Sequence, residues 1–233
     1  MMGLIILLIT RTKNRVIYAK EGFAITALAW VIMALVGAVP FTLSGEIPSY
    51  VDAVFETVSG FTTTGASILP NVEVLSHGLL FWRSFTHWIG GMGVLVFLLA
   101  ILPLAGGSQV HLMRAESPGP SVEKLVPKTR YTALILYALY IVLTIVEFLL
   151  LLIGKMPAFD ALLTTLGTAG TGGFSFKNDG MASYSPYVQW VTGIFMVLFG
   201  VNFNVYFLLL IRKWKQALKC EELRVYFGIV LAA

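Results

Sequence analysis

Long apolar runs alternate with short polar segments along this chain. Four runs reach the length of about twenty mostly apolar residues that a helix needs to cross a bilayer: 22–43, 78–104, 131–153 and 186–211. Shorter segments, 49–60 and 157–168, follow the first and third runs, and their length fits a re-entrant helix better than a span. The pattern predicts an all-α membrane protein with four crossings and two short helices that enter the membrane and turn back.

The two short segments belong to an internal repeat. A shift of 108 positions aligns sixteen residues from Asp52 onward without a gap, and it also places Trp82 against Trp190. The identical pairs in the gapless stretch are Asp52/Asp160, Ala53/Ala161, Thr57/Thr165, Thr63/Thr171, Gly65/Gly173 and Ser67/Ser175. Each copy therefore consists of a crossing, a short helix, a loop rich in Thr and Gly, and a second crossing.

The loops that end the two short segments, 61–67 and 169–175, place irregular backbone at membrane depth. Unpaired N–H and C=O groups are tolerated there only when protein buries them or when they line water. One use is a ring of carbonyls that replaces the hydration shell of an ion, and Gly suits such a ring because it adopts positive φ. A Gly that only caps a helix would explain one isolated copy, whereas two copies in register favour the ion-binding interpretation.

The candidate ion-binding groups are backbone carbonyls in both loops. They belong to Thr62, Thr63, Thr64, Gly65 and Ala66 in the first loop and to Thr171, Gly172, Gly173 and Phe174 in the second. The carbonyl end of each short helix would support them, because the negative pole of a helix dipole favours a cation. The second loop lacks the triple Thr of the first. This difference predicts that the two sides of the ion-binding ring are unequal and that the ring discriminates less strictly between ions.

Composition and charge agree with a membrane protein. Hydrophobic residues make up 58% of the chain and charged residues 12%, about half the charged share of soluble domains. Thirteen of the 16 Lys and Arg lie in the segments 11–20, 114–130 and 212–224, which the positive-inside rule makes cytoplasmic. Because these charges are spread over short loops, nucleic acid is not the expected partner. The outer side would hold acidic residues that attract cations if they face a pore: Glu46, Asp52, Glu56, Glu73, Asp160 and Asp179.

Two charged residues lie within crossings, where an unpaired charge is costly. Arg83 is one of them. Its expected partner is Glu56, on the short helix before the first loop, and the pair would support the ion-binding loop. The alternative is that Arg83 extends outward to the membrane interface. Glu147 is the other charged residue, and it is either a proton relay or, more simply, a carboxyl bonded to a neighbouring helix.

The second crossing also carries small and polar residues with structural meaning. Gly90, Gly91 and Gly93 would let another helix or loop approach closely. His87 follows Arg83 by one helical turn and fits a helix contact. Together with His77 and His111 it lacks the spacing of metal ligands, so the only metal expected is a cation held by the loop carbonyls.

Four motifs in order resemble one family of membrane transporters. They are the segments 52–66, 81–93, 114–120 and 172–175. They resemble the Trk/Ktr/HKT potassium transporters, and the linker motif 114–120 favours the TrkH type. The resemblance implies four helix–pore-loop–helix repeats around a pseudo-fourfold pore, with one filter glycine per loop, here Gly65 and Gly173. Because this sequence shows two repeats of the expected four, we expect a fragment of a longer protein or, less simply, an assembly of half-length chains.

The chain is therefore expected to divide into five parts. These are the end of a preceding helix with a basic cytoplasmic loop, the first repeat, a cytoplasmic linker, the second repeat, and a basic cytoplasmic loop with the start of the next helix: 1–21, 22–104, 105–129, 130–211 and 212–233.

The same resemblance implies potassium uptake through a channel-like filter in a multi-pass protein of the bacterial inner membrane. No enzymatic step and no cofactor are implied. The implied partners are a TrkA-like cytoplasmic nucleotide-binding regulatory subunit, a second copy of the protein in a homodimer, and membrane lipid. The alternative is a sodium-permeable or proton-coupled carrier of the same fold, which Glu147 and the plainer second loop favour. An intramembrane enzyme would need paired acids, a metal cluster or a nucleophile with a base, and the sequence places none at suitable spacing.

Overall fold

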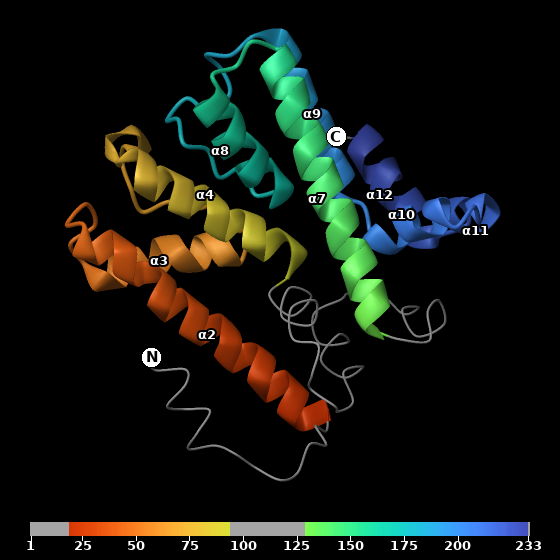
Figure 1. The fold of residues 1–233 in the computed structure, drawn as a ribbon, viewed down its shortest axis with the longest axis horizontal. Coiled ribbons are helices and arrows are strands. Elements are labelled where there is room, and N and C mark those ends of the chain that lie inside the picture. Colours follow the sequence, from red (N-terminus) through yellow and green to blue (C-terminus); the bar gives the residue numbers. More distant parts are fainter. Residues whose placement is uncertain (1–18, 94–128, 233) are drawn as a thin grey trace.

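The computed structural model describes residues 19–93 and 129–232, and every regular element in these ranges is a helix (Figure 1). The elements are α2 (Ala19–Leu43), α3 (Tyr50–Phe61), the 3-10 helix η1 (Val72–Val74), α4 (His77–Met92), α7 (Thr129–Ile153), α8 (Ala158–Ala169), α9 (Pro186–Gly200), α10 (Phe203–Leu210), α11 (Trp214–Leu218) and α12 (Glu221–Ala232). The all-α prediction is confirmed for these residues. The amino-terminal 18 residues, the end of the expected crossing 78–104 and nearly all of the linker 105–129 lie outside the described ranges.

The short helices lie where the repeat predicts them. Helices α3 and α8 each have 12 residues, and both ends of α8 are 108 positions after those of α3. The hydroxyl of Thr57 donates to the carbonyl of Ala53 (2.7 Å), and Thr165 repeats this bond to Ala161 (2.8 Å). The internal repeat is therefore a repeat of structure as well as of sequence.

The long helices α2 and α7 follow a slightly different shift. They end at Leu43 and Ile153, which are 110 positions apart. The turns that follow them also match at 110, because Gly45 (φ 77°) and Lys155 (φ 61°) both adopt positive φ. The second repeat is thus two residues shorter between this turn and its short helix.

The expected crossing 186–211 is not one continuous helix. Helix α9 ends at Gly200, Val201 is extended (φ −70°, ψ 137°), and α10 begins at Phe203. Gly and Asn are weak helix formers, and they flank this break as Gly200 and Asn202. Tyrosine hydroxyls donate to carbonyls in the last turn of α9, from Tyr206 to Leu198 (2.7 Å) and from Tyr226 to Val197 (2.9 Å). The bond to Val197 satisfies a carbonyl that the end of the helix leaves free, while the Leu198 carbonyl also accepts the N–H of Val201 (3.2 Å).

Helix α4 lies between the two short helices, α3 and α8 (Figure 1). Its Gly90 packs against the carbonyl of Phe61, so closely that a β-carbon at Gly90 would clash with it. A β-carbon at Gly91 would lie 2.7 Å from the carbonyl oxygen of Ala169. The prediction of close approach is confirmed for Gly90 and Gly91, and the elements that they admit are the carbonyl ends of both short helices.

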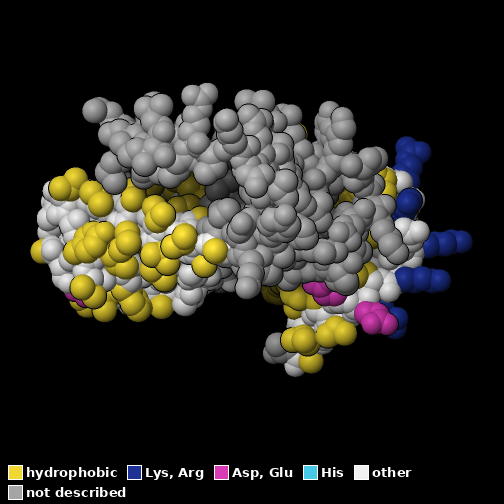
Figure 2. All heavy atoms as spheres, turned by 90° about the horizontal axis from the view of Figure 1, so that it is seen from below, with side chains coloured by type: hydrophobic (Ala, Val, Ile, Leu, Met, Phe, Trp, Pro, Cys, Tyr) yellow, Lys and Arg dark blue, Asp and Glu magenta, His cyan; other side chains and the backbone are white. Residues whose placement is uncertain are grey.

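The outer surface carries large exposed apolar side chains and a group of basic ones. Large apolar side chains are exposed on α2, α7 and α9, including Leu28, Val142 and Trp190. Lys and Arg gather around α11 at the opposite end of the face seen in Figure 2. Within the described ranges, the helical stretch Leu134–Ile153 is long and apolar enough to cross a membrane, while Ala27–Leu43 and Pro186–Gly200 are apolar but shorter.

Candidate ion-binding site

The two Thr/Gly loops have the same unusual backbone. Thr63 and Thr171 adopt φ of 53° and 57°, and Gly65 and Gly173 adopt φ of 76° and 67°. Positive φ is uncommon for a residue other than Gly, above all a β-branched one. Two such residues at matching positions show that the chain takes the same path in both repeats.

Each loop continues directly from its short helix. The N–H groups of Thr62, Thr63 and Thr64 donate to carbonyls in the last turns of α3 at 2.8, 3.1 and 3.0 Å. In the second repeat the N–H of Thr171 donates to the carbonyl of Thr168 (2.8 Å). The loop N–H groups are therefore used to bind the loop to its helix, which leaves the carbonyls as the groups available to an ion.

Some of the candidate carbonyls are unengaged and others are not. Within the described part of the chain, no hydrogen bond reaches the carbonyls of residues 62–65 or of Thr171 and Gly172. The carbonyl of Ala66 accepts a bond from the Ser59 hydroxyl of its own short helix. The matching carbonyl of Phe174 also faces its own short helix, because a β-carbon at Gly167 would lie 3.1 Å from it. The carbonyls at this last position of each loop thus point back to the supporting helix.

The two loops touch each other through their glycines. A β-carbon at Gly65 would clash with the carbonyl of Gly172, and one at Gly172 would clash with the carbonyl of Thr63. Gly173 differs, because its β-carbon would meet nothing within 4 Å among the described residues. Gly65 is required both by its φ and by the contact between loops, whereas Gly173 is required by its φ alone.

Arg83 pairs with Glu56, as the sequence predicts. Arg83 Nε donates to Glu56 Oε1 at 2.6 Å, and the two side chains are 2% and 0% exposed. The same carboxylate accepts bonds from the hydroxyl of Ser67 (3.0 and 3.1 Å) and the N–H of Ile68 (2.9 Å). Glu56 therefore holds both Arg83 and the segment that follows the first loop.

Arg83 also reaches into the second loop. Its Nη1 donates to the carbonyl of Ser175 at 2.6 Å, and its Cζ lies 3.3 Å from the centre of the Phe174 ring. The ring of His87 stacks on Phe174 at 5.0 Å, and it packs against Gly172, whose β-carbon would lie 2.6 Å from His87 Cε1. One face of α4 thus connects the support of the first loop to the side chain and backbone of the second.

The sequence did not reveal that Phe174 is anchored through its ring. It predicted a carbonyl role for Phe174 and a helix contact for His87. The spacing of Arg83 and His87 by one turn was the available signal, because it places both side chains on the same face of α4. Their partner could not be identified, since it lies about ninety positions away in the other repeat.

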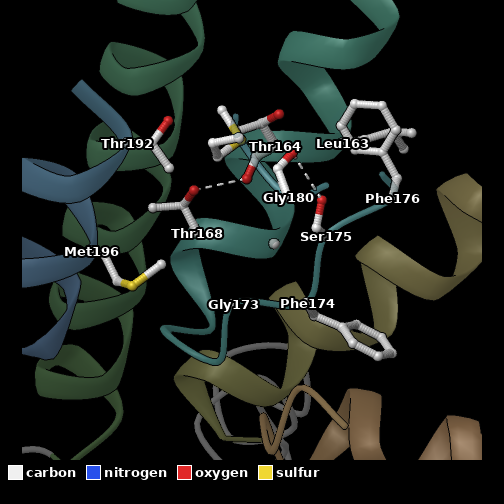
Figure 3. Close-up of a pocket in the computed structure, with 12 residues that line it drawn as sticks. Leu163, Thr164, Thr168, Gly173, Phe174, Ser175, Phe176, Gly180, Thr192 and Met196 are labelled. Carbon is white, nitrogen blue, oxygen red and sulfur yellow. Dashed lines mark hydrogen bonds between the residues drawn. The ribbon is translucent and has the colours of Figure 1, made fainter. Parts of the chain in front are cut away.

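The second repeat lacks the buried ion pair. The residues that match Glu56 and Arg83 are Thr164 and Val191. A cavity of about 100 Å³ lies behind the second loop in this region (Figure 3). Its lining includes Thr164, Thr168, Ser175, Phe176, Thr192 and Met196. The two loops are therefore supported by different means, one by a charged network and the other around a cavity.

Several of the expected acidic residues take part in local contacts. Glu46 accepts a bond from the N–H of Ser76 (2.8 Å), Glu56 is buried in the pair with Arg83, and Asp160 accepts one from the Tyr184 hydroxyl (2.7 Å). Burial, the hydrogen bond to Asp160 and nearby acidic charges raise the pKa of Tyr184. Several of these carboxylates thus serve local structure.

The segments that follow the two loops are joined through Asn178. Its side chain accepts a bond from the N–H of Val72 (3.0 Å) and donates to Asn71 (2.6 Å). Its backbone N–H donates to Glu73 (3.1 Å). One residue of the second repeat therefore fixes the position of three consecutive residues of the first.

Long apolar helices packed around two short helices with Thr/Gly loops define a helical membrane protein of the transport class. The chain belongs to the TrkH family, described as "Cation transport protein", whose family model matches residues 5–229.

Named relatives and a solved structure agree with this assignment. The chain is 39% identical to "Trk system potassium uptake protein TrkH" of Salmonella typhimurium, over 95% of this chain and 47% of that protein. It is 33% identical to "Trk system potassium uptake protein TrkG" of Escherichia coli, over the same shares of the two chains. The crystal structure of the potassium transporter TrkH from Vibrio parahaemolyticus matches with a TM-score of 0.64 and 31% identity, over 85% of this chain and 38% of that one. The chain thus spans about half the length of the curated relatives it matches.

Proposed function

We propose that this chain forms two walls of a potassium filter in a protein that takes up potassium across the bacterial inner membrane. The observation that carries the proposal is the pair of loops with matching positive-φ residues, Thr63 with Gly65 and Thr171 with Gly173. Their unengaged carbonyls lie at the carbonyl ends of two short helices. Carbonyl oxygens in this setting replace the hydration shell of a cation, and the helix dipole adds to the attraction.

The groups proposed to bind the ion are the unengaged carbonyls of residues 62–65, Thr171 and Gly172, together with that of Gly173, which also accepts the N–H of Ser175 (2.8 Å). The carbonyls of Ala66 and Phe174 were candidates as well, and their orientation gives them a supporting role instead. Two loops cannot enclose an ion on all sides. Two more helix–pore-loop–helix units would complete a pseudo-fourfold ring, and the length of the relatives leaves room for them.

The proposed role of Glu56 and Arg83 is to hold the two loops in a fixed relation. Glu56 binds the segment after the first loop, and Arg83 binds the carbonyl and ring of neighbouring residues in the second. A filter selects by the position and number of its carbonyls. A rigid connection between loops would therefore preserve selectivity as ions pass.

The partners proposed from the family are a TrkA-like cytoplasmic regulatory subunit and a second copy of the whole protein. The relatives are named as members of the Trk system, which supports a multi-component assembly. The exposed apolar faces of α2, α7 and α9 would contact lipid or the remaining repeats. Pull-down of the complete membrane protein with the regulatory subunit, and its mass in detergent, would test both partners.

The transport proposal is tested by rubidium uptake in potassium-transport-deficient bacteria that express the complete reading frame containing this chain. Competition by potassium but not by sodium is the expected result. Equal competition by both ions would overturn the proposed selectivity while leaving the fold intact. No uptake, with membrane insertion and the regulatory partner verified, would overturn the transport proposal.

A sodium-permeable or proton-coupled carrier is the second candidate function. It is favoured by the second loop, which lacks the triple Thr, and by the buried Glu147 within α7. Uptake that depends on the pH gradient at fixed membrane voltage would support proton coupling. Uptake that is indifferent to that gradient would exclude it.

A further inference from the structure

Glu147 is a buried carboxyl group that no contact explains. It lies in the apolar stretch Leu134–Ile153 of α7, is 0% exposed, and neither of its carboxyl oxygens has a hydrogen-bond partner among the described residues. Within those ranges Arg83–Glu56 is the only ion pair, so no cation neutralises Glu147. An ionised carboxylate without partners is strongly unfavourable in such a place.

The internal repeat shows which residue of the first repeat corresponds to Glu147. By the shift of 110 that relates α2 to α7, Glu147 matches Gly37. Gly37 lies against α3: a β-carbon there would stand 2.7 Å from Thr57 Cγ2 and 2.9 Å from Phe61 Cε2. A large side chain on the short helix thus covers a residue without a side chain on the long helix.

In the second repeat the large and the small side chain are exchanged between the long helix and the short helix. Phe61 at the end of α3 is matched by Ala169 at the end of α8, and both are buried. The small side chain is now on the short helix and the large one, Glu147, is on the long helix. By this correspondence Glu147 would occupy the space that the Phe61 ring fills in the first repeat, with its polar group at the end of the second short helix.

The hydroxyl of Thr168 lies beside the Glu147 carboxyl. Its single proton is donated to the carbonyl of Thr164 at 2.8 Å (Figure 3). Toward Glu147 this oxygen can therefore only accept a hydrogen bond, and a carboxylate can also only accept. The Tyr140 hydroxyl, two turns away on α7, is likewise used, since it donates to the carbonyl of Trp88 (2.8 Å). A bond between Glu147 and Thr168 requires the proton to be on Glu147.

We propose that Glu147 is a neutral, protonated acid that donates to Thr168 Oγ1 and so positions the last turn of α8. Thr168 is the residue whose carbonyl receives the N–H of Thr171, where the second loop begins with positive φ. Glu147 thus acts on the loop through Thr168, as a positioning residue. This positioning role rests on the proposed function of the loops, whereas the protonated state of Glu147 does not.

Infrared spectroscopy of the complete protein tests the protonated state independently of transport. At neutral pH the wild type should show the C=O stretch of a protonated carboxyl, shifted in heavy water, and Glu147→Gln should lose it. The control variant is Glu221→Gln, which changes an exposed carboxyl on α12 and should keep the band. A wild type without that band, or a band that survives in Glu147→Gln, would overturn the proposal.

Rubidium uptake tests the positioning role by comparing substitutions that keep the hydrogen bond with substitutions that remove it. Glu147→Gln keeps a neutral donor of the same shape and should retain uptake within about twofold, with an unchanged pH profile. Glu147→Leu removes the donor and should lower uptake about tenfold or more. Thr168→Val should act like Glu147→Leu, and Thr168→Ser like the wild type. Equal uptake by the Gln and Leu variants would overturn the positioning role.

An exchange of side chains between the repeats tests the packing part of the argument. Ala169→Phe alone should disrupt folding because the space is filled by Glu147. The double variant Glu147→Gly with Ala169→Phe copies the arrangement of the first repeat and should restore folded protein in detergent. If the double variant folds no better than Ala169→Phe alone, the two side chains do not share one space. Loss of uptake in every protein including the wild type would instead count against the proposed function, and the infrared result would stand.

Discussion

Gly65 of the first loop lies directly against the carbonyl of Gly172 in the second, with no room for a β-carbon between them. This contact joins the two repeats at the residues proposed to bind the ion. Its tightness distinguishes Gly65 from Gly173, which has a similar φ but open space around it.

The first prediction follows from that difference. Gly65→Ala should abolish selective rubidium uptake, because the added methyl group must separate the loops. Gly173→Ala should reduce uptake only partly, since positive φ costs a non-Gly residue roughly 1–2 kcal/mol. Gly180→Ala is the matched control, with φ of 64° and open space outside the loops. Wild-type uptake by Gly65→Ala would contradict the contact.

The second prediction concerns the buried pair of Glu56 and Arg83. Glu56→Gln or Arg83→Gln should each lower the free energy of unfolding by about 3–5 kcal/mol, because breaking a buried pair leaves one charge unpaired. The double variant should be less damaged than the sum of the two, and unfolding in detergent measures this coupling. Arg224→Gln, on the exposed surface of α12, is the control for loss of one charge. Additive effects would show that the pair is not coupled.

The third prediction concerns Asn178, which joins the segments after the two loops. Asn178→Ala removes the bonds to Val72 and Asn71 and should lower the free energy of unfolding by about 1–3 kcal/mol. Asn178→Asp keeps the acceptor for Val72 but places a carboxylate oxygen against the acceptor oxygen of Asn71 and beside Glu73, so it should be at least as destabilising as Asn178→Ala. Thermal unfolding in detergent orders the variants. An Ala variant as stable as the wild type would contradict the role of Asn178 in joining the segments.

The fourth prediction tests the backbone of the second loop. Thr171 is exposed and adopts φ of 57°, so Thr171→Gly should keep both the loop conformation and rubidium uptake. Relief of strain and the greater freedom of Gly when unfolded oppose each other, and stability should change by less than about 1 kcal/mol. Thr171→Pro should abolish uptake, because the Pro ring fixes φ near −65°. Retained uptake in the Pro variant would contradict the positive φ.

The sequence predicted the features that depend on local pattern or on charge. The shift of 108 located α3 and α8 to within one residue, because it depends on matched positions and not on propensity. The partner of Arg83 could be inferred because a charge inside a crossing requires one, and Glu56 was the acid closest to the loop. Both inferences use constraints that hold whatever the tertiary structure.

Features that depend on contacts between repeats could not be predicted. The positive φ of Thr63 and Thr171 contradicts the preference of a β-branched residue and is visible only in the folded loops. The ring of Phe174 rests on Arg83 and His87, which lie far away in sequence. The break after Gly200 was missed because the apolar run continues through it without a charged or Pro residue to mark an end.

The different supports behind the two loops have a mechanical consequence. Glu56 and Arg83 fill the space behind the first loop with short, charge-assisted bonds, whereas a cavity lined by Thr164 and Thr192 lies behind the second. The two loops share their backbone conformation, whereas the side chains that support them differ. If the loops bind the ion as proposed, the first loop would be the stiffer and the second the more compliant, so an ion of the wrong size would displace mainly the second loop.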